Sequence, residues 1–125
     1  MNHIPSPGFA RNPHKVITVE TFAGTFTVTA NGVTVASTSR AKVLHEPPYP
    51  TAFYIPFEDV DFSQLEKTAH STHCPYKGEA SYWSVIPAGN SGMNAMWAYE
   101  HPFREMMAIE NHGAFYPDRV TIVSS

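Results

Sequence analysis

Hydrophobic and polar positions alternate most regularly in TFTVTANGVTVAST, residues 25–38. Alternation with a period of two predicts two β-strands, and Asn31-Gly32 can take the positive φ angles of a two-residue type I′ turn. In this register Val28 faces Val35, and the apolar side chains share one face while threonines occupy the other. The segment is therefore predicted to be a β-hairpin that covers a core on one side only.

The same pattern predicts further strands along the chain, in KVITVET (15–21), RAKVLHE (40–46), TAFYIP (51–56), GEASYWSVI (78–86), MNAMWAYE (93–100) and AFYPDRVTIVS (114–124), the last interrupted by Pro117. Along GEASYWSVI, Trp83 and Val85 are predicted to face one way, and Ala80 and Tyr82 the other.

Other segments are predicted to be helix, turn or loop. Residues 102–112 have an apolar stripe and a proline in the first turn, which predicts one short helix ending at Gly113. Residues 58–66 are predicted to form a turn with at most one helical turn, capped by Asp61 or Ser63. Residues 88–92 are predicted to be a loop.

The chain is predicted to have two parts. Residues 1–14 contain three prolines and are predicted to form an extended N-terminal arm, followed by a single β domain over residues 15–125. The predicted fold class is thus mainly β, with antiparallel sheets and one short helix.

Charge and composition exclude several classes of function. Eight Lys plus Arg against eleven Asp plus Glu give a net charge of −3, and no basic run exists, so neither nucleic acid nor a membrane surface is an expected partner. No stretch approaches the ~18 apolar residues of a membrane span, and the N-terminal residues lack the apolar core of a secretory signal. A cytoplasmic protein is expected.

The single cysteine, Cys74, excludes an intramolecular disulfide and a Cys-rich zinc site within one chain.

The densest candidate chemistry lies in HSTHCPYKGEASYWSV, residues 70–85. The spacing of His70, His73 and Cys74 is too loose for a recognised metal site, so no metal or other cofactor is predicted. Cys74 could be an activated nucleophile or a buried turn residue. Lys77, beside a flexible glycine, could bind an anion or transfer a proton, or it could be a solvated turn lysine.

Aromatic residues with polar tips are numerous for so small a domain. Tyr82, Trp97, Tyr99 and Tyr116 could belong to the core, as most aromatic residues do, or could line a pocket in which a ligand satisfies the hydroxyl groups.

The motifs PGFARNPH, STSRAKVLHE, YPTAFYIPFEDVD, THCPYKGEASYWSV, MWAYEHP and AFYPDRV, in this order, resemble the family known as domain of unknown function 427. The resemblance implies a small antiparallel domain of the Mss4-like, or β-tent, type. The paired CxxC zinc motifs of some Mss4-like proteins are absent here. The family is sometimes labelled a nucleotidyltransferase family. This sequence has neither the glycine-rich phosphate loop nor the paired carboxylates that would support that activity. The recurrent polar and aromatic residues of the family correspond here to Arg40, Glu46, Tyr54, His73, Cys74, Lys77, Gly78, Tyr82, Trp97, Tyr99 and Tyr116.

Two functional hypotheses follow. The first is a cofactor-free enzyme, of lyase, isomerase or cyclase type, acting by general acid–base chemistry on a small, partly apolar molecule in an aromatic pocket. Its catalytic residues are predicted to be His73 as proton shuttle, Lys77 holding an oxygen, and Tyr82 as hydrogen-bond donor. Substrate-binding residues are predicted to be Arg40, Glu46, Tyr54, Cys74, Trp97, Tyr99 and Tyr116. The alternative is a non-catalytic module that binds a small ligand or a peptide. A homodimer through exposed strand edges is compatible with either hypothesis.

Overall fold

The computed structural model describes residues 3–125, and this part of the chain is mainly β, as predicted. Its strands are β1 (Thr18–Thr21), β2 (Phe26–Ala30), β3 (Val33–Thr38), β4 (Lys42–His45), β5 (Ala52–Pro56), β6 (Leu65–Cys74), β7 (Gly78–Val85), β8 (Met96–Ala98), β9 (His112–Phe115) and β10 (Thr121–Ser124). The helical elements are α1 (Pro7–Arg11) and the 3-10 helices η1 (Phe57–Asp59), η2 (Phe62–Gln64), η3 (Ile86–Gly92) and η4 (Arg104–Ile109).

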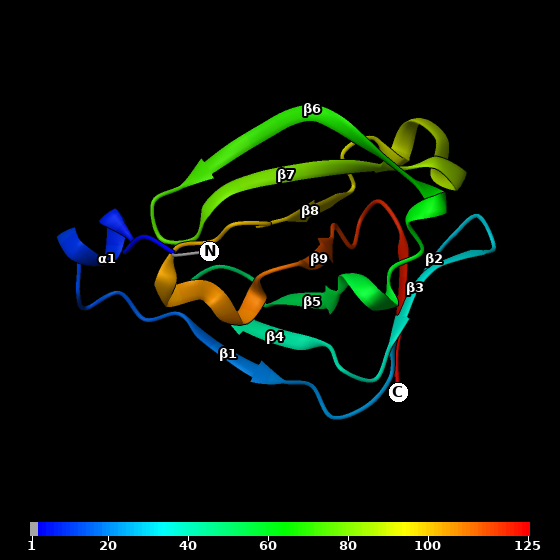
Figure 1. Ribbon diagram of the computed structural model, residues 1–125. Helices are drawn as coiled ribbons and strands as arrows, with labels where there is room; N and C mark the ends of the chain where they lie inside the picture. The colour runs from blue at the N-terminus through cyan, green and yellow to red at the C-terminus, as the bar shows by residue number, and fades with distance from the viewer. Residues whose placement is uncertain (1–2) are drawn as a thin grey trace.

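The strands form two antiparallel sheets rather than a closed barrel. The larger sheet has the order β1-β4-β5-β9-β8-β7-β6, and the smaller has the order β10-β2-β3. Figure 1 shows the larger sheet running from β6 at the top to β1 at the bottom, with β2 and β3 standing at one end of it. Over residues 3–125, the chain contains no helix with both the length and the apolar character that a membrane crossing requires.

The central strands of the larger sheet bury side chains on both faces. On one face Trp83, Val85 and Ile55 pack with residues of the smaller sheet, including Phe26 and Val28. On the other face a second cluster contains Leu44, Tyr54, Ala80, Tyr82, Tyr99 and Ala114, together with Met106 and Ile109 of η4. Because successive side chains of a strand point to opposite faces, neighbours such as Tyr82 and Trp83 serve different clusters. The predicted division of faces along β7 is confirmed.

The predicted hairpin is present, with one change of register. Asn31 and Gly32 have φ angles of 50° and 81°, as the type I′ turn requires. Beyond the first pairs a β-bulge shifts the register, so that Val28 pairs with Ala36 instead of Val35. The predicted pairing of Val28 with Val35 was therefore wrong. The bulge lets two consecutive residues of β3, Val35 and Ala36, both be buried.

Strand β6 was not predicted. Its ten residues, LEKTAHSTHC, are almost all exposed or half-buried, so they lack the apolar alternation by which strands are recognised. The strand forms because it pairs along β7 at the edge of the sheet, from Leu65 opposite Val85 to Cys74 opposite Gly78. Polar and charged side chains are typical of such an edge because they discourage pairing with other chains.

The helix expected over residues 102–112 is shorter and of a different type. Only Arg104–Ile109 is helical, as a 3-10 segment interrupted at Met106, where φ is −117° and ψ is 23°. The chain leaves this segment through Asn111, which has a φ of 55°. Gly113 is not a helix stop but a strand residue, and a Cβ there would lie 2.6 Å from the Sδ atom of Met96.

Three smaller expectations also change. The N-terminal arm is not extended throughout, because Ser6 caps the short helix α1 by accepting a hydrogen bond from the Phe9 N–H group. The loop predicted at 88–92 belongs to η3. The final strand is two strands, β9 and β10, which lie in different sheets. Of the two predicted caps in residues 58–66, Asp61 is the one observed, at the start of η2.

Candidate functional site

A cavity of about 620 Å³ opens on the tyrosine-rich face of the larger sheet and reaches the smaller sheet. Most of its lining is apolar or aromatic, which is typical of sites that bind small organic molecules. The lining residues are Phe26, Leu44, Glu46, Pro50, Thr51, Ala52, Phe53, Tyr54, Lys77, Tyr82, Trp97, Tyr99, Phe115, Tyr116, Pro117, Ile122 and Ser124.

The cavity lies where two neighbouring strands separate. Pairing between β5 and β9 runs from Pro56 opposite His112 to Tyr54 opposite Ala114, and stops there. Strand β5 begins two residues earlier, at Ala52, whereas the chain after β9 turns away as the Tyr116 N–H group donates to the carbonyl of Ala95. The divergence leaves a gap in the sheet, and the residues beyond the last pair line the cavity.

Three of the tyrosine hydroxyl groups differ in their hydrogen bonding. The hydroxyl of Tyr54 accepts a bond of 3.2 Å from the Trp97 indole Nε1–H group, and the hydroxyl of Tyr82 lies 2.9 Å from Oγ1 of Thr72. Tyr99 is only 7% exposed, and its hydroxyl has no hydrogen-bond partner among residues 3–125. Since no fully buried side-chain oxygen or nitrogen in this part of the chain lacks a partner, the Tyr99 hydroxyl is not fully enclosed, and Tyr99 is one of the residues that line the cavity.

Burial keeps Tyr54, Tyr99 and Tyr116 protonated at neutral pH. Burial raises the pKa of Tyr54 and of Tyr99 well above the usual value, because the phenolate would lose its hydration. Burial, together with hydrogen bonding to Tyr82, raises the pKa of Tyr116 to about 12. The phenol groups are therefore hydrogen-bond donors rather than bases in this cavity.

A carboxylate held by two ammonium groups forms the polar end of the cavity. Oε1 of Glu46 lies 2.5 Å from Nζ of Lys77, and Oε2 lies 3.1 Å from Nζ of Lys15. Burial of Glu46 disfavours its ionised form, but the hydrogen bonds and charges of Lys77 and Lys15 outweigh this and hold the pKa of Glu46 below its usual range. Lys77 is only 8% exposed, so the alternative of a solvated turn lysine is wrong.

The structure brings together most of the residues predicted from the sequence. Seven of them line the cavity: Glu46, Tyr54, Lys77, Tyr82, Trp97, Tyr99 and Tyr116. His73 does not, since it lies on the edge strand β6 with its side chain 54% exposed, and its Nδ1 atom is 3.0 Å from Oε1 of Glu79. Cys74 is half-buried beside the tyrosine cluster and is not part of the lining. His73 and Cys74 therefore do not form one site with Lys77 and Tyr82.

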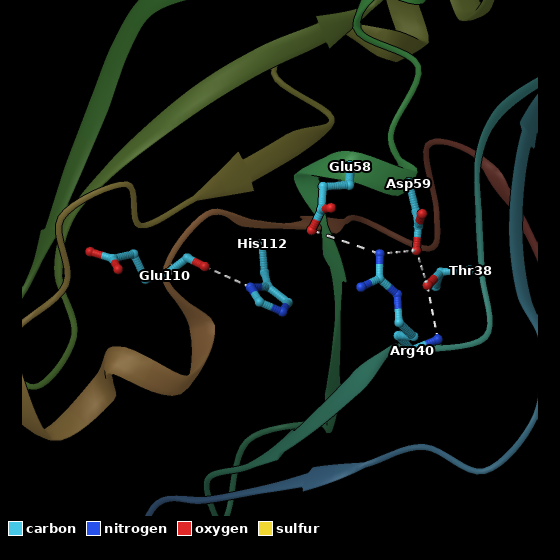
Figure 2. A network of polar contacts seen from close by, with 6 residues as sticks. All are labelled: Thr38, Arg40, Glu58, Asp59, Glu110 and His112. Atoms are coloured by element: carbon cyan, nitrogen blue, oxygen red, sulfur yellow. Dashed lines mark hydrogen bonds and ion pairs between the residues drawn. The ribbon is translucent and has the colours of Figure 1, made fainter.

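Arg40 belongs to a separate polar network, shown in Figure 2. Its Nη2 atom lies 3.2 Å from Oδ2 of Asp59 and 3.8 Å from Oε1 of Glu58, and Thr38 donates to the same Asp59 oxygen at 2.6 Å. This network ties the connection between β3 and β4 to η1. His112, at the start of β9, donates from Nδ1 to the carbonyl of Glu110, and burial lowers its pKa. Neither Arg40 nor His112 lines the cavity.

Several lining residues were missed. Phe26, Ile122 and Ser124 come from the smaller sheet, and no local pattern indicates which strand end a second sheet will approach. Lys15, which binds Glu46 but is not part of the lining, was also missed, because this contact joins residues 31 positions apart. Within residues 3–125, no group of three or more His, Cys, Asp or Glu residues is arranged to hold a metal ion.

Comparison with known proteins identifies the family. Residues 18–125 match the family described as a domain of unknown function (DUF427), and the chain belongs to that family. No curated protein matches the chain. Assignment of the fold to the Mss4-like, or β-tent, type stays a prediction.

Two tyrosines of the cavity should differ in their effect on stability. Tyr54→Phe removes the acceptor of the Trp97 indole group and should lower the free energy of unfolding by about 0.5–1.5 kcal/mol. Tyr99→Phe breaks no hydrogen bond among the described residues and should leave stability within about 0.5 kcal/mol of the wild type. Urea denaturation of both variants measures the difference, and equal losses would contradict this description of the two hydroxyl groups.

The Glu46 carboxylate should make stability depend on pH in the acid range. Because its pKa in the folded protein is lowered from 4.5, its contribution is complete above about pH 4.5 and is lost as the pH falls through the lower, folded-state value. Glu46→Gln should cost about 3 kcal/mol at pH 7, the low end for breaking a buried pair. The difference between wild type and variant should shrink on acidification.

The matched control is Glu79→Gln, which breaks the exposed pair with His73 and should cost less than about 1 kcal/mol. Urea midpoints measured between pH 3 and pH 7 test both variants. A difference between wild type and Glu46→Gln that is the same at every pH would show that the carboxylate is not held by the two lysines.

Proposed function

We propose that the chain binds a small, partly apolar organic molecule in the tyrosine-lined cavity, and that an oxygen of the ligand accepts a hydrogen bond from the Tyr99 hydroxyl group. The observation that carries the proposal is this hydroxyl, which belongs to a lining residue only 7% exposed, is not fully enclosed and has no partner among residues 3–125. A donor in such a position costs free energy unless water or a ligand accepts its bond.

The balance of donors and acceptors supports an acceptor on the ligand. Tyr54 and Tyr99 remain protonated because burial raises their pKa values. Lys77 donates to Glu46 and has further N–H groups, because an ammonium group carries three donors. The only carboxylate of the lining, Glu46, is already bound by two ammonium groups. A carbonyl, carboxylate or ether oxygen is thus better matched than a donor.

The walls determine the other part of the ligand. Trp97 and Tyr116 lie with ring centroids 4.5 Å apart, and the rings of Phe26 and Phe53 stack at 4.7 Å on the side of the smaller sheet. A cavity of about 620 Å³ with these walls suits an alicyclic or aromatic body. A binding module of this kind is the better supported of the two hypotheses, because the only carboxylate of the lining, Glu46, is held by two ammonium groups and its pKa lies below the usual range, which makes it a weak base.

A general acid–base reaction in the same cavity is the second candidate. It is favoured by the Lys77–Glu46 pair, because the buried ammonium can polarise a ligand oxygen while the carboxylate accepts a proton from the adjacent carbon and returns it. Lys77 and Tyr82 keep the roles predicted from the sequence. His73 does not take part, since it lies outside the cavity.

Pairing of two copies through a strand edge is compatible with both candidates. The edge strands of the larger sheet are β1 and β6, and both are mostly exposed. A homodimer of this kind stays a prediction.

The binding proposal can be tested with the two tryptophans as internal probes. A library of small aromatic and alicyclic ketones, alcohols, amides and carboxylates is screened by native mass spectrometry, and hits are titrated by ¹H–¹⁵N NMR. Trp97 lines the cavity, whereas Trp83 packs on the opposite face of the sheet. Ligand should therefore shift the indole signal of Trp97 and leave that of Trp83 in place.

The Tyr99 hydroxyl should contribute to affinity. Tyr99→Phe is expected to weaken binding about 2- to 12-fold, the equivalent of a hydrogen bond worth about 0.5–1.5 kcal/mol. Tyr49→Phe, at a tyrosine that is 64% exposed and outside the lining, is the matched control and should not change affinity. Hits that bind without moving the Trp97 signal, or equal affinities for wild type and Tyr99→Phe, would contradict the proposal.

The acid–base candidate predicts turnover that depends on Lys77 but not on His73. Each hit is incubated with protein in D₂O and recovered for mass spectrometry. Wild type should exchange a C–H hydrogen beside the ligand's oxygen-bearing carbon for deuterium or convert the ligand, Lys77→Met should lose this activity, and His73→Ala should keep it. A ligand recovered unlabelled and unchanged from the wild type would leave binding as the function.

A further inference from the structure

The N-terminal segment places a charge beside the polar end of the cavity, against the lining residue Glu46, from outside the family-matched part of the chain. The family match begins at residue 18, whereas Lys15 places its Nζ atom 3.1 Å from Oε2 of Glu46. The Lys15 side chain is 18% exposed, and its ammonium group lies over the rings of Tyr76 and Tyr49 at 5.1 and 5.5 Å from their centroids. Contact with Glu46 raises the pKa of Lys15, so the group is charged at neutral pH.

The segment before Lys15 is anchored to the turn that holds Lys77. The carbonyl of Pro75 accepts two hydrogen bonds, from the Gly8 N–H group at 2.9 Å and from the Ser6 hydroxyl at 2.7 Å. Phe9 packs edge-on against Tyr76, with centroids 5.1 Å apart. A Cβ at Gly8 would lie 2.7 Å from the Pro75 oxygen, so only glycine allows this approach. Figure 1 shows α1 beside the turn between β6 and β7.

The charges at this end of the cavity do not cancel. Glu46 and Lys77 are the only charged residues of the lining, and they neutralise each other. Lys15 adds a second ammonium group, so two cations and one carboxylate leave a net charge of +1. No other charged side chain among residues 3–125 lines the cavity, so nothing else in the lining offsets the remaining charge.

We infer that the ligand carries a carboxylate group, and that Lys15 determines the preference for this group over an uncharged oxygen acceptor. The inference rests on the proposed binding function and adds the charge of the ligand to it. Lys15 acts through Glu46. By holding Oε2 of that residue, it offsets the carboxylate that would otherwise repel an anion and leaves the Lys77 ammonium and the Tyr99 hydroxyl available to the ligand.

The test compares two probes of almost the same shape, cyclohexanecarboxylate and cyclohexanecarboxamide, by NMR titration on the Trp97 indole signal at pH 7. Wild type should prefer the carboxylate by about tenfold, the scale of one partly screened charge interaction. Lys15→Met should reduce the preference to about twofold or less, mainly through weaker binding of the carboxylate. Lys15→Arg should retain the preference, because it keeps the charge.

Two controls separate charge from folding. Lys67→Met removes a lysine that pairs with Glu100 outside the cavity, and the preference should stay at the wild-type value. Amide affinity within about twofold of the wild type in Lys15→Met would show that the cavity has kept its shape. If Lys15→Met unfolds, the same comparison with Lys15→Gln and with wild type in increasing salt replaces it, and the carboxylate preference should fall in both.

The outcomes distinguish the inference from the proposed function. Two results would overturn the inference and leave the binding function standing. In the first, wild type binds the carboxylate and the amide equally well. In the second, folded Lys15→Met keeps the wild-type preference for the carboxylate. Binding of neither probe to the wild type would overturn the inference. The binding function itself fails only if no member of the broader library shifts the Trp97 signal.

Discussion

The burial of one carboxylate, that of Glu46, constrains the arrangement of the whole site. Removing an ionised carboxylate from water costs several kcal/mol unless opposite charges and hydrogen bonds offset the loss. Here the offsetting groups come from two places distant in the chain: Lys77 in the turn between β6 and β7, and Lys15 after the N-terminal helix. Three segments must therefore meet at one point. That point is also the polar end of the cavity, so the same contact that joins the segments sets the charge that a ligand encounters.

The cavity itself is a consequence of how strands diverge. A sheet whose strands bury both faces has no room for a ligand while its pairing is complete. Because β5 and β9 stop pairing at Tyr54 and Ala114, the residues beyond this pair are not joined by backbone hydrogen bonds, and several of them line the cavity. The aromatic rings around the gap are held in position by contacts with one another, such as that of Tyr54 with Trp97. Tyr99, whose hydroxyl has no hydrogen-bond partner within residues 3–125, is the residue on which the proposed binding function depends.

The predictions from sequence succeeded where structure follows from near neighbours. The Asn31-Gly32 turn and the two faces of β7 were predicted because backbone preference and side-chain alternation act over a few residues. They failed where distant contacts decide. Strand β6 has no apolar alternation and exists because β7 pairs with it, and the bulge at Val35 forms because the smaller sheet gains a second buried side chain. Gly113 was assigned to a helix end, whereas the space filled by Met96 explains it.

For the site, the residue types were determined by the sequence, and their grouping by the tertiary structure. Trp97, Lys77 and the tyrosines Tyr82, Tyr99 and Tyr116 could be selected as candidates from their residue types and positions beside predicted strands. Glu46 and Tyr54 were selected only through the resemblance to the family. Which of them share a cavity depends on which strand faces turn inward, and this places His73 on an exposed edge and Lys77 inside. Lys15 could not be found from the sequence, because an ion pair between residues 31 positions apart leaves no local pattern. Alternation, turn chemistry and family membership thus follow from the sequence, whereas the cavity and its charge arise only when the distant segments pack together.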